Sequence, residues 1–252
     1  MALTVALTAC GGGGSSTPTS PSPTPNLPAG GACGAIGTAI INGSDCTNTA
    51  SVVLINLRDK DGPLGACSGT IIAARAVLTA AHCLVGGVTT AQIFLGTGPQ
   101  IVASSFAAYP GYQEGDPNGL DVGVIKFDQD IGRLPIPVLL SRDARVGETA
   151  VIAGWGRNQN LEAATLRAGA TTISAVGATQ LQTQFSSTAA SICSGDSGGP
   201  LLLNEGGTWG VAGINSAVTT GACNTGTAFY TNLRNANISA FILAQVPDAR
   251  RN

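Results

Sequence analysis

Residues 193–200 read Cys-Ser-Gly-Asp-Ser-Gly-Gly-Pro, and the central serine of this run, Ser197, has glycines close on both sides. Far upstream, residues 79–83 read Thr-Ala-Ala-His-Cys and contain His82, the only histidine of the chain. A serine hydroxyl is a poor nucleophile until a neighbouring base takes its proton. Histidine is the side chain whose ordinary pKa suits that task near neutral pH. The two segments therefore predict a nucleophilic serine whose proton can be taken by a single imidazole base.

The composition of the 252-residue chain is typical of short strands joined by turns. Charged residues make up 10% and aromatic residues 4%, while 35 residues are glycine. This length suits one large all-β domain or two smaller ones, and the composition does not fit long charged helices. The formal net charge is −2. No basic cluster interleaves with aromatic residues, so we expect no nucleic-acid partner. No apolar run reaches the ~18 residues of a membrane-spanning helix.

Apolar segments separated by turn signals predict the strands. An early run at 51–57 is rich in Val, Leu and Ile, and residues 70–72 and 76–79 predict a tightly connected pair. The pattern continues at 93–95, 122–127, 150–153, 171–176, 201–203, 209–214 and 228–232. Only 235–246 predicts a helix, because its apolar residues recur at the spacing of one helical face. Many strands with one terminal helix favour β-barrels or a sandwich.

Seven cysteines predict disulfides, and disulfides indicate export to an oxidising compartment. Cys10 stands alone before a low-complexity stretch. The other six can be paired by neighbourhood: Cys33–Cys46, Cys67–Cys83 and Cys193–Cys223. Sequence alone leaves other connectivities open. The spacing is not that of a zinc site, so we expect no metal and no other cofactor.

Residues 1–39 predict an N-terminal region that precedes the folded domain. Residues 7–10, Leu-Thr-Ala-Cys, resemble the lipobox of bacterial lipoproteins, whose cysteine (here Cys10) is lipidated after signal cleavage. Residues 11–28 are mainly Gly, Ser, Thr and Pro, a composition that favours an extended spacer. The stretch before Cys10 is short and has no Lys or Arg. Either the true start lies further upstream, or this region is a flexible tail with a stray cysteine.

The order of residues along the chain separates three known arrangements of serine, histidine and acid. Residues 195–199 formally match the G-x-S-x-G turn of α/β-hydrolases, but that family places its histidine after the serine. The acids available for a subtilisin order, which needs one before His82, look like solvated turn residues: Asp45, Asp59 and Asp61. The third order, His then Asp then Ser, points to Asp121. That carboxylate begins an apolar strand, where burial would be costly without a purpose.

Five motifs in this order resemble those of the chymotrypsin-like serine protease family. They are Ala-Ala-His-Cys (80–83), Leu-Asp-Val (120–122), Gly-Trp-Gly (154–156), Gly-Asp-Ser-Gly-Gly-Pro (195–200) and the strand 209–216. The resemblance covers residues 40–252. It implies an all-β fold of two six-stranded antiparallel Greek-key barrels, at about 40–140 and 141–232, with a C-terminal helix at about 235–246. The active site would lie between the barrels.

The resemblance also implies roles for individual residues. His82, Asp121 and Ser197 would form the catalytic triad, and the N–H groups of Gly195 and Ser197 would form the oxyanion hole. The strand residues Ser216, Ala217 and Val218 would pair with the substrate backbone.

The same resemblance places four residues at the primary specificity pocket: Ser191, Ile192, Val218 and Ala228. Ser191 would lie at the base of the pocket, where an acid would be needed to attract Lys or Arg. Ile192 and Val218 would fill pocket volume. We therefore expect cleavage after small apolar residues, with modest selectivity.

Residues 40–43, Ile-Ile-Asn-Gly, look like the mature N-terminus of this family. Cleavage between Ala39 and Ile40 would free an ammonium group that pairs with Asp196 and orders the oxyanion loop. A Cys33–Cys46 disulfide would then keep the N-terminal region attached.

These observations predict a serine endopeptidase that is made as a zymogen and acts as a monomer on peptide or protein substrates. We expect it to be secreted or held at a bacterial cell envelope, with membrane contact only through a lipid at Cys10. Two alternatives stay open. One is a catalytically silent surface-binding protein on the same fold, and the other is an esterase that uses the same triad.

Overall fold

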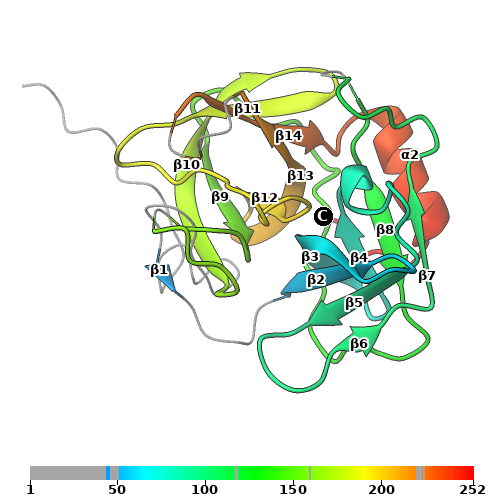
Figure 1. Cartoon of the computed structure of the whole chain (residues 1–252). Helices are drawn as coiled ribbons and strands as arrows, with labels where there is room; N and C mark the ends of the chain where they lie inside the picture. Colours follow the sequence, from blue (N-terminus) through cyan, green and yellow to red (C-terminus); the bar gives the residue numbers. More distant parts are fainter. Residues whose placement is uncertain (1–43, 46–50, 117–118, 159, 220–222, 224) are drawn as a thin grey trace, which may run out of the picture.

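The computed structural model describes residues 44–45, 51–116, 119–158, 160–219, 223 and 225–252. Two β-sheets and one C-terminal helix make up this part of the chain (Figure 1). Residues Cys10, Cys33, Ile40 and Cys46 lie outside the described residues, and the predictions made for them lie there too.

The first sheet has seven antiparallel strands in the order β6-β5-β2-β3-β4-β8-β7. Its strands are β2 (Val52–Arg58), β3 (Pro63–Ala73), β4 (Ala76–Thr79), β5 (Thr90–Phe94), β6 (Ile101–Val102), β7 (Ser105–Ala108) and β8 (Gly123–Lys126). No pairing among the described residues joins β6 to β7, so this sheet curls into a half-barrel.

The second sheet also has seven strands, in the order β1-β10-β11-β14-β13-β12-β9. They are β1 (Ser44–Asp45), β9 (Thr149–Gly154), β10 (Arg167–Val176), β11 (Gln180–Gln184), β12 (Pro200–Glu205), β13 (Thr208–Val218) and β14 (Thr227–Asn232). An additional pairing of β9 with β10 closes β9–β14 into a six-stranded barrel, and β1 pairs with the outer part of β10.

The hydrophobic core is continuous across the two sheets. Strand β2 forms at the predicted apolar run, with Val53 and Ile55 fully buried. These side chains belong to the same cluster as Trp155, which follows β9 of the second sheet. The Trp155 indole N–H donates to the Val52 carbonyl at 3.1 Å, so the sheets are joined by a buried hydrogen bond as well as by apolar packing. The two sheets are therefore fixed against each other at this point.

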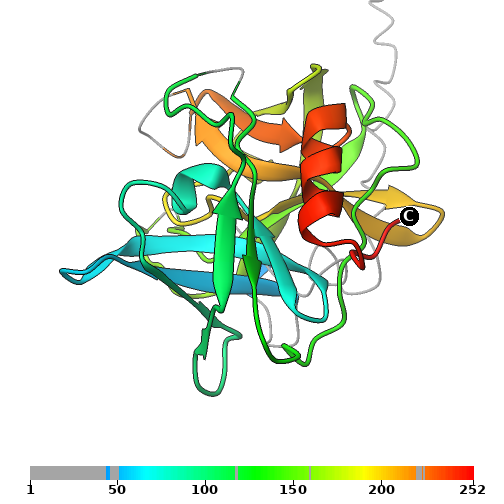
Figure 2. The ribbon, with the colours of Figure 1, turned by 90° about the vertical axis from the view of Figure 1, so that its right-hand side faces the viewer.

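Helix α2 (Ala236–Gln245), near the C-terminus, packs against the first sheet (Figures 1 and 2). Asn235 caps it, because its side-chain oxygen accepts hydrogen bonds from the N–H groups of Asn237 (3.0 Å) and Ile238 (3.3 Å). Ile238 and Ile242, one helical turn apart, are buried in the core cluster of the first sheet. The C-terminal segment therefore leaves the second sheet and packs on the first.

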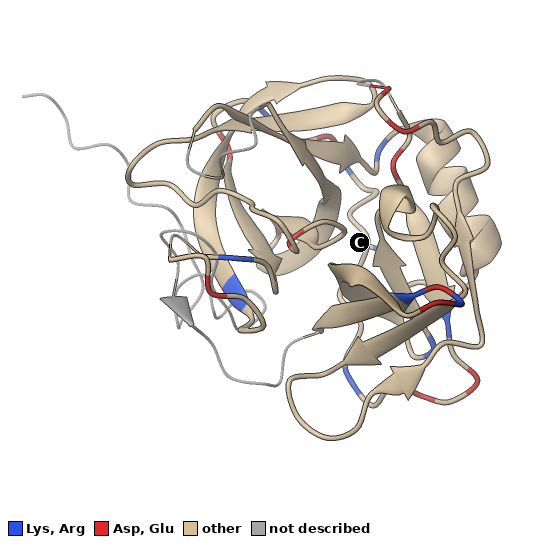
Figure 3. Cartoon of the chain, in the orientation of Figure 1, with Lys and Arg blue, Asp and Glu red and all other residues tan. Residues whose placement is uncertain are grey.

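The predicted all-β, two-barrel fold with a C-terminal helix is confirmed. Each sheet has seven strands, and the second sheet closes whereas the first stays a half-barrel. Charged residues are few and scattered along the chain (Figure 3). No helix of the described residues is long and apolar enough to cross a membrane.

Candidate active site

His82 is held at the edge of the first sheet by a short turn of helix. This 3₁₀ turn, η1 (Ala81–Cys83), follows β4 directly. Ala81 and Cys83 are buried on either side of the histidine, and a disulfide ties Cys83 to Cys67 on β3. The His82 side chain is 27% exposed, so its ring lies at the surface of the cleft while its backbone is anchored in the core.

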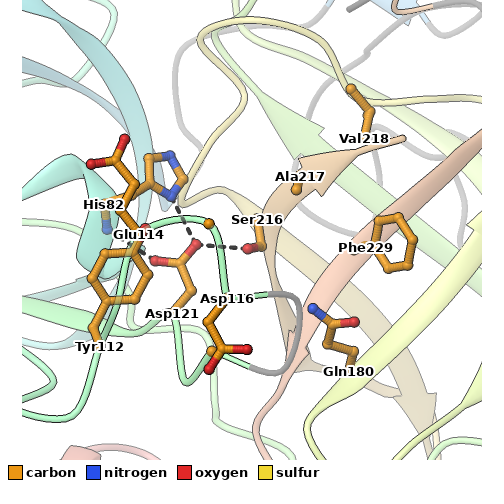
Figure 4. Close-up of a pocket in the computed structure, with 12 residues that line it drawn as sticks. His82, Tyr112, Glu114, Asp116, Asp121, Gln180, Ser216, Ala217, Val218 and Phe229 are labelled. Carbon is orange, nitrogen blue, oxygen red and sulfur yellow. Dashed lines mark hydrogen bonds and ion pairs between the residues drawn. The ribbon is translucent and has the colours of Figure 1, made fainter. Parts of the chain in front are cut away.

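Asp121 lies just before β8 and binds His82 twice (Figure 4). The His82 backbone N–H donates to Oδ1 at 2.9 Å, and the ring Nδ1 lies 2.7 Å from Oδ2. Ser216 Oγ donates to the same Oδ2 at 2.6 Å. Burial would raise the pKa of the Asp121 carboxyl, but the bonds from His82 and Ser216 and the charge of His82 outweigh it and lower the pKa below 3.8.

An ionised Asp121 can only accept hydrogen bonds, so Nδ1 of His82 carries the proton in the bond between them. The other ring nitrogen, Nε2, is then the one with a lone pair. This is the tautomer that a general base needs. The carboxylate holds both the orientation and the protonation pattern of the ring.

Ser197 lies in the turn before β12 and meets the first sheet beside His82. The Ser68 backbone N–H donates to the Ser197 carbonyl at 2.7 Å. The Cys83 Sγ, one residue after His82, lies 3.9 Å from the same carbonyl oxygen. Within the described residues Ser197 Oγ makes no hydrogen bond to His82, a bond that is often long before substrate binds.

Two backbone N–H groups of the same turn have no acceptor within the described part of the chain. The N–H groups of Asp196, Gly198 and Gly199 donate to carbonyls of Cys193, Asn215 and Asp196, at 3.0, 2.8 and 2.9 Å. Those of Gly195 and Ser197 do not donate to any described residue. Two unused donors close together in one turn are suited to binding an anionic oxygen.

The conformation of this turn requires glycine at position 195. Gly195 has φ +95°, and a Cβ there would lie 2.9 Å from the Gly156 Cα. Its carbonyl accepts a hydrogen bond from Ser68 Oγ at 2.8 Å, and the Trp155 N–H donates to that hydroxyl at 2.9 Å. Ser68 thus links both sheets to the turn that presents the two N–H groups.

Asp196 is a buried carboxylate directly beneath this turn. It is 1% exposed, and it accepts hydrogen bonds from the N–H groups of Cys193 and Gly156, each at 2.8 Å. Burial raises its pKa to about 7, against the lowering effect of these two bonds and of the Arg167 charge. Among the described residues no ion pair reaches it. The carboxyl is therefore short of a positive partner.

Residues predicted for the primary pocket come together near the Cys193–Cys223 disulfide. Ile192 and Ala228 are buried, and the half-buried Val218 packs against the cluster to which both belong. Ser191 is also buried, at 3% exposure. Ala217 is exposed and Ser216 half-buried, on the part of β13 that continues past its last pairing with β12 at Ile214.

Sequence reasoning missed two residues that position the candidate site. Ser68 bridges the sheets, and its place immediately after Cys67 was the available signal. Thr231, on β14, donates through Oγ1 to the Asp121 backbone carbonyl at 2.9 Å. A threonine inside a strand has no sequence signature that distinguishes it, so nothing in the sequence points to this contact.

A comparison with protein families shows to which family the chain belongs. A family model described as Trypsin matches residues 40–239. This chain belongs to the trypsin family. The solved structure of HL collagenase is similar to this trypsin-family chain, with a TM-score of 0.71 and 20% identity, covering 82% of this chain and 99% of that one. At that identity the likeness supports the fold.

Relatives of this trypsin-family chain come from insects and bacteria. Chymotrypsin-2 of Vespa crabro is 29% identical over 66% of this chain and 84% of its own length. Trypsin of Saccharopolyspora erythraea is 28% identical over 66% and 82%. Trypsin theta of Drosophila melanogaster is 32% identical over 46% of this chain, and the match spans about half of that relative, 48%.

Proposed function

We propose that this trypsin-family chain is a serine endopeptidase that works through an acyl-enzyme. One observation carries the proposal: His82 is fixed by Asp121 with Nε2 available, beside a serine turn that offers two unused N–H donors. A general base, a nucleophile and an oxyanion site are the three parts that acyl transfer requires. Membership of the family supports peptides or proteins as the substrates.

The proposed reaction follows from these positions. Ser197 Oγ attacks the carbonyl carbon of the substrate while Nε2 of His82 takes the hydroxyl proton. The carbonyl oxygen becomes negative and is stabilised by the N–H groups of Gly195 and Ser197. His82 then gives its proton to the leaving amine, and the C–N bond breaks. Water repeats the sequence on the acyl-enzyme and returns Ser197 to its hydroxyl form.

For specificity, we propose small apolar residues at the cleaved position, whose carbonyl is attacked. The packing of Val218 against the cluster that contains Ile192 and Ala228 supports this, because these side chains fill volume that a large residue would need. Ser191 supplies no negative charge for Lys or Arg. The open edge of β13 beyond Ile214 supports pairing of the substrate backbone with residues 216–218.

We further propose that the enzyme is a zymogen activated by cleavage between Ala39 and Ile40. The buried Asp196, with its raised pKa, supports this proposal because its carboxylate has no ion-pair partner among the described residues, and an ammonium group would supply one. N-terminal sequencing of the active enzyme should find Ile40 as the first residue. Full activity with an intact Ala39–Ile40 bond would contradict the proposal.

The remaining proposals concern the whole protein. We propose a secreted or envelope-bound bacterial monomer whose protease domain spans residues 40–252 and whose N-terminal region is lipidated at Cys10. A Cys33–Cys46 disulfide would keep that anchor attached after cleavage. Reductant should then release the cleaved domain from membranes, and retention of the domain would contradict the tether.

A fluorophosphonate probe tests the central proposal. The activated protein should be labelled, whereas Ser197→Ala and His82→Ala should not, because the probe reacts with a serine activated by its base. Absence of labelling in the activated wild type would favour the silent binding protein. Peptide amides should be hydrolysed as well as simple esters, and hydrolysis of esters alone would favour the esterase.

A further inference from the structure

A cavity of about 360 Å³ opens beside the proposed catalytic pair, and Val218 is the one residue that it shares with the predicted primary pocket. In Figure 4 it extends from His82, Tyr112 and Glu114 on one side to Gln180 and Phe229 on the other. Its lining comes from both sheets and from the loop between β7 and β8. Among its lining residues, only His82, Asp121 and those of β13 have a role in the proposed reaction or in substrate pairing.

The cavity carries negative charge. Glu114 and Asp116 line it, both exposed, and Asp121 lies at its inner end. No Lys or Arg is among its lining residues. Burial, followed by the charges of Asp121 and Glu114, raises the pKa of Tyr112 to about 12. Burial is the larger cause, and the smaller effect of the two carboxylates has the sign expected of a negative potential in the cavity.

The walls suit a long side chain with a charged end. Tyr112 and Phe229 offer aromatic faces, against which aliphatic stems pack and cations are attracted. Ala217 contributes only a methyl group from β13, which leaves the space above the strand open. An uncharged apolar group would also fit the walls, but it would gain nothing from the two carboxylates.

The position of the cavity indicates which substrate residue reaches it. In an extended peptide, successive side chains point to opposite faces. If the cleaved residue points toward Ile192 and Ala228, which do not line the cavity, then the second and fourth residues before the cleaved bond point to the other face, along the cavity. These are the two positions from which a side chain can enter it.

We propose that Glu114 and Asp116 make this cavity a subsite for a Lys or Arg side chain, two or four residues before the cleaved bond. The inference rests on the proposed endopeptidase function and refines its substrate class. The substrate would then combine a small residue at the cleaved position with a cationic residue upstream. Its positive charge would be recognised outside the primary pocket.

Fluorogenic peptide amides with Ala at the cleaved position test the subsite. Arg, Lys, Gln and norleucine are compared at the second and then at the fourth position. We expect kcat/KM to be about 3- to 10-fold higher for Arg or Lys than for Gln at one of them, the effect of one or two partly exposed ion pairs. The preference should shrink at high ionic strength, because salt screens such pairs.

Variants identify the residues responsible. Glu114→Gln with Asp116→Asn should bring the Arg-to-Gln ratio close to one. Asp128→Asn removes one negative charge from an exposed residue that lines a separate hollow, so it should leave the ratio unchanged. Equal kcat/KM for Arg and Gln at both positions would overturn the subsite while the endopeptidase stands. A ratio that survives the double substitution would overturn it too.

A binding measurement covers the case in which no peptide is hydrolysed, which would overturn the proposed function. Fluorescence anisotropy on Ser197→Ala compares labelled peptides that carry Arg or Gln at the same positions. Tighter binding of the Arg peptide, by a similar factor, supports the subsite, and equal affinities overturn it.

Discussion

The raised pKa of Asp196 should make the uncleaved chain less stable as pH rises. The carboxyl titrates near 3.8 when exposed, and burial raises its pKa to about 7 in the folded state. Between these values the folded protein keeps a proton that the unfolded chain has lost, so the free energy of unfolding falls with increasing pH. Three pKa units correspond to about 4 kcal/mol. Stability from this group is complete below pH ~4 and is lost as pH passes ~7.

Asp196→Asn removes the titration while keeping the shape of the side chain. The amide forfeits one of two hydrogen bonds from Cys193 and Gly156, a pH-independent loss of about 1–3 kcal/mol. Urea denaturation at pH 4 and pH 8 measures both proteins, each on a Ser197→Ala background so that the chain stays uncleaved. We expect the stability difference between wild type and variant to move by about 4 kcal/mol in favour of the variant at pH 8.

An exposed acid elsewhere in the chain supplies the matched control. Asp128→Asn, at an exposed acid, should give a curve parallel to that of the parent across the same range. Parallel curves for Asp196→Asn would refute the reasoning, because the carboxyl would then be ionised throughout. Cleaved wild-type protein should lose less stability at high pH than the uncleaved chain if the Ile40 ammonium pairs with Asp196.

Four further substitutions test the site and the packing around it. Asp121→Asn should lower kcat by about 10⁴-fold by fixing the wrong tautomer of the histidine; a loss below about tenfold in peptide hydrolysis would contradict that role. Gly198→Ala should lower the free energy of unfolding by more than about 3 kcal/mol, since its Cβ would lie 2.1 Å from Thr79 Oγ1 at φ +82°. Gly206→Ala, at φ +58° with no atom within 4 Å of the added Cβ, should cost about 1 kcal/mol in the same denaturation assay; equal losses would refute the steric argument. Val218→Gly should shift cleavage toward larger apolar residues by about 10- to 200-fold, and an unchanged profile in a peptide library would exclude Val218 from the pocket.

The sequence predicted the fold well where strands are buried on their inner face. Strand β2 was expected at 51–57 and lies at Val52–Arg58, because nearly all of its Val, Leu and Ile residues are buried in the core. Strand β11 (Gln180–Gln184) was not predicted. It is mostly glutamine, and only Leu181 and Thr183 face inward. Its partners β10 and β14 make it a strand, and long-range pairing of this kind has no local signal.

The candidate-site residues likewise fall into those that the sequence predicts and those that it does not. His82, Asp121 and Ser197 could be proposed because each stands in a motif whose residue types carry the chemistry. Thr231 and the acidic cavity depend on which loops meet in space. Glu114 lies in a polar turn that reads as ordinary solvent-exposed chain, and only the fold shows that it lines a cavity together with Phe229 of β14.

The proposed catalytic residues are divided between the two sheets, and this determines when they come together during synthesis of the chain. His82 and Asp121 belong to the first sheet, whereas Ser197 and Ser216 belong to the second. Neither half alone holds a base beside its nucleophile, and the docking bonds from Ser68 and Thr231 form only after both halves have folded. With the proposed mechanism, a nascent or misfolded chain would therefore be inert toward its neighbours. Correct folding is the first safeguard, in place before any processing of the N-terminus.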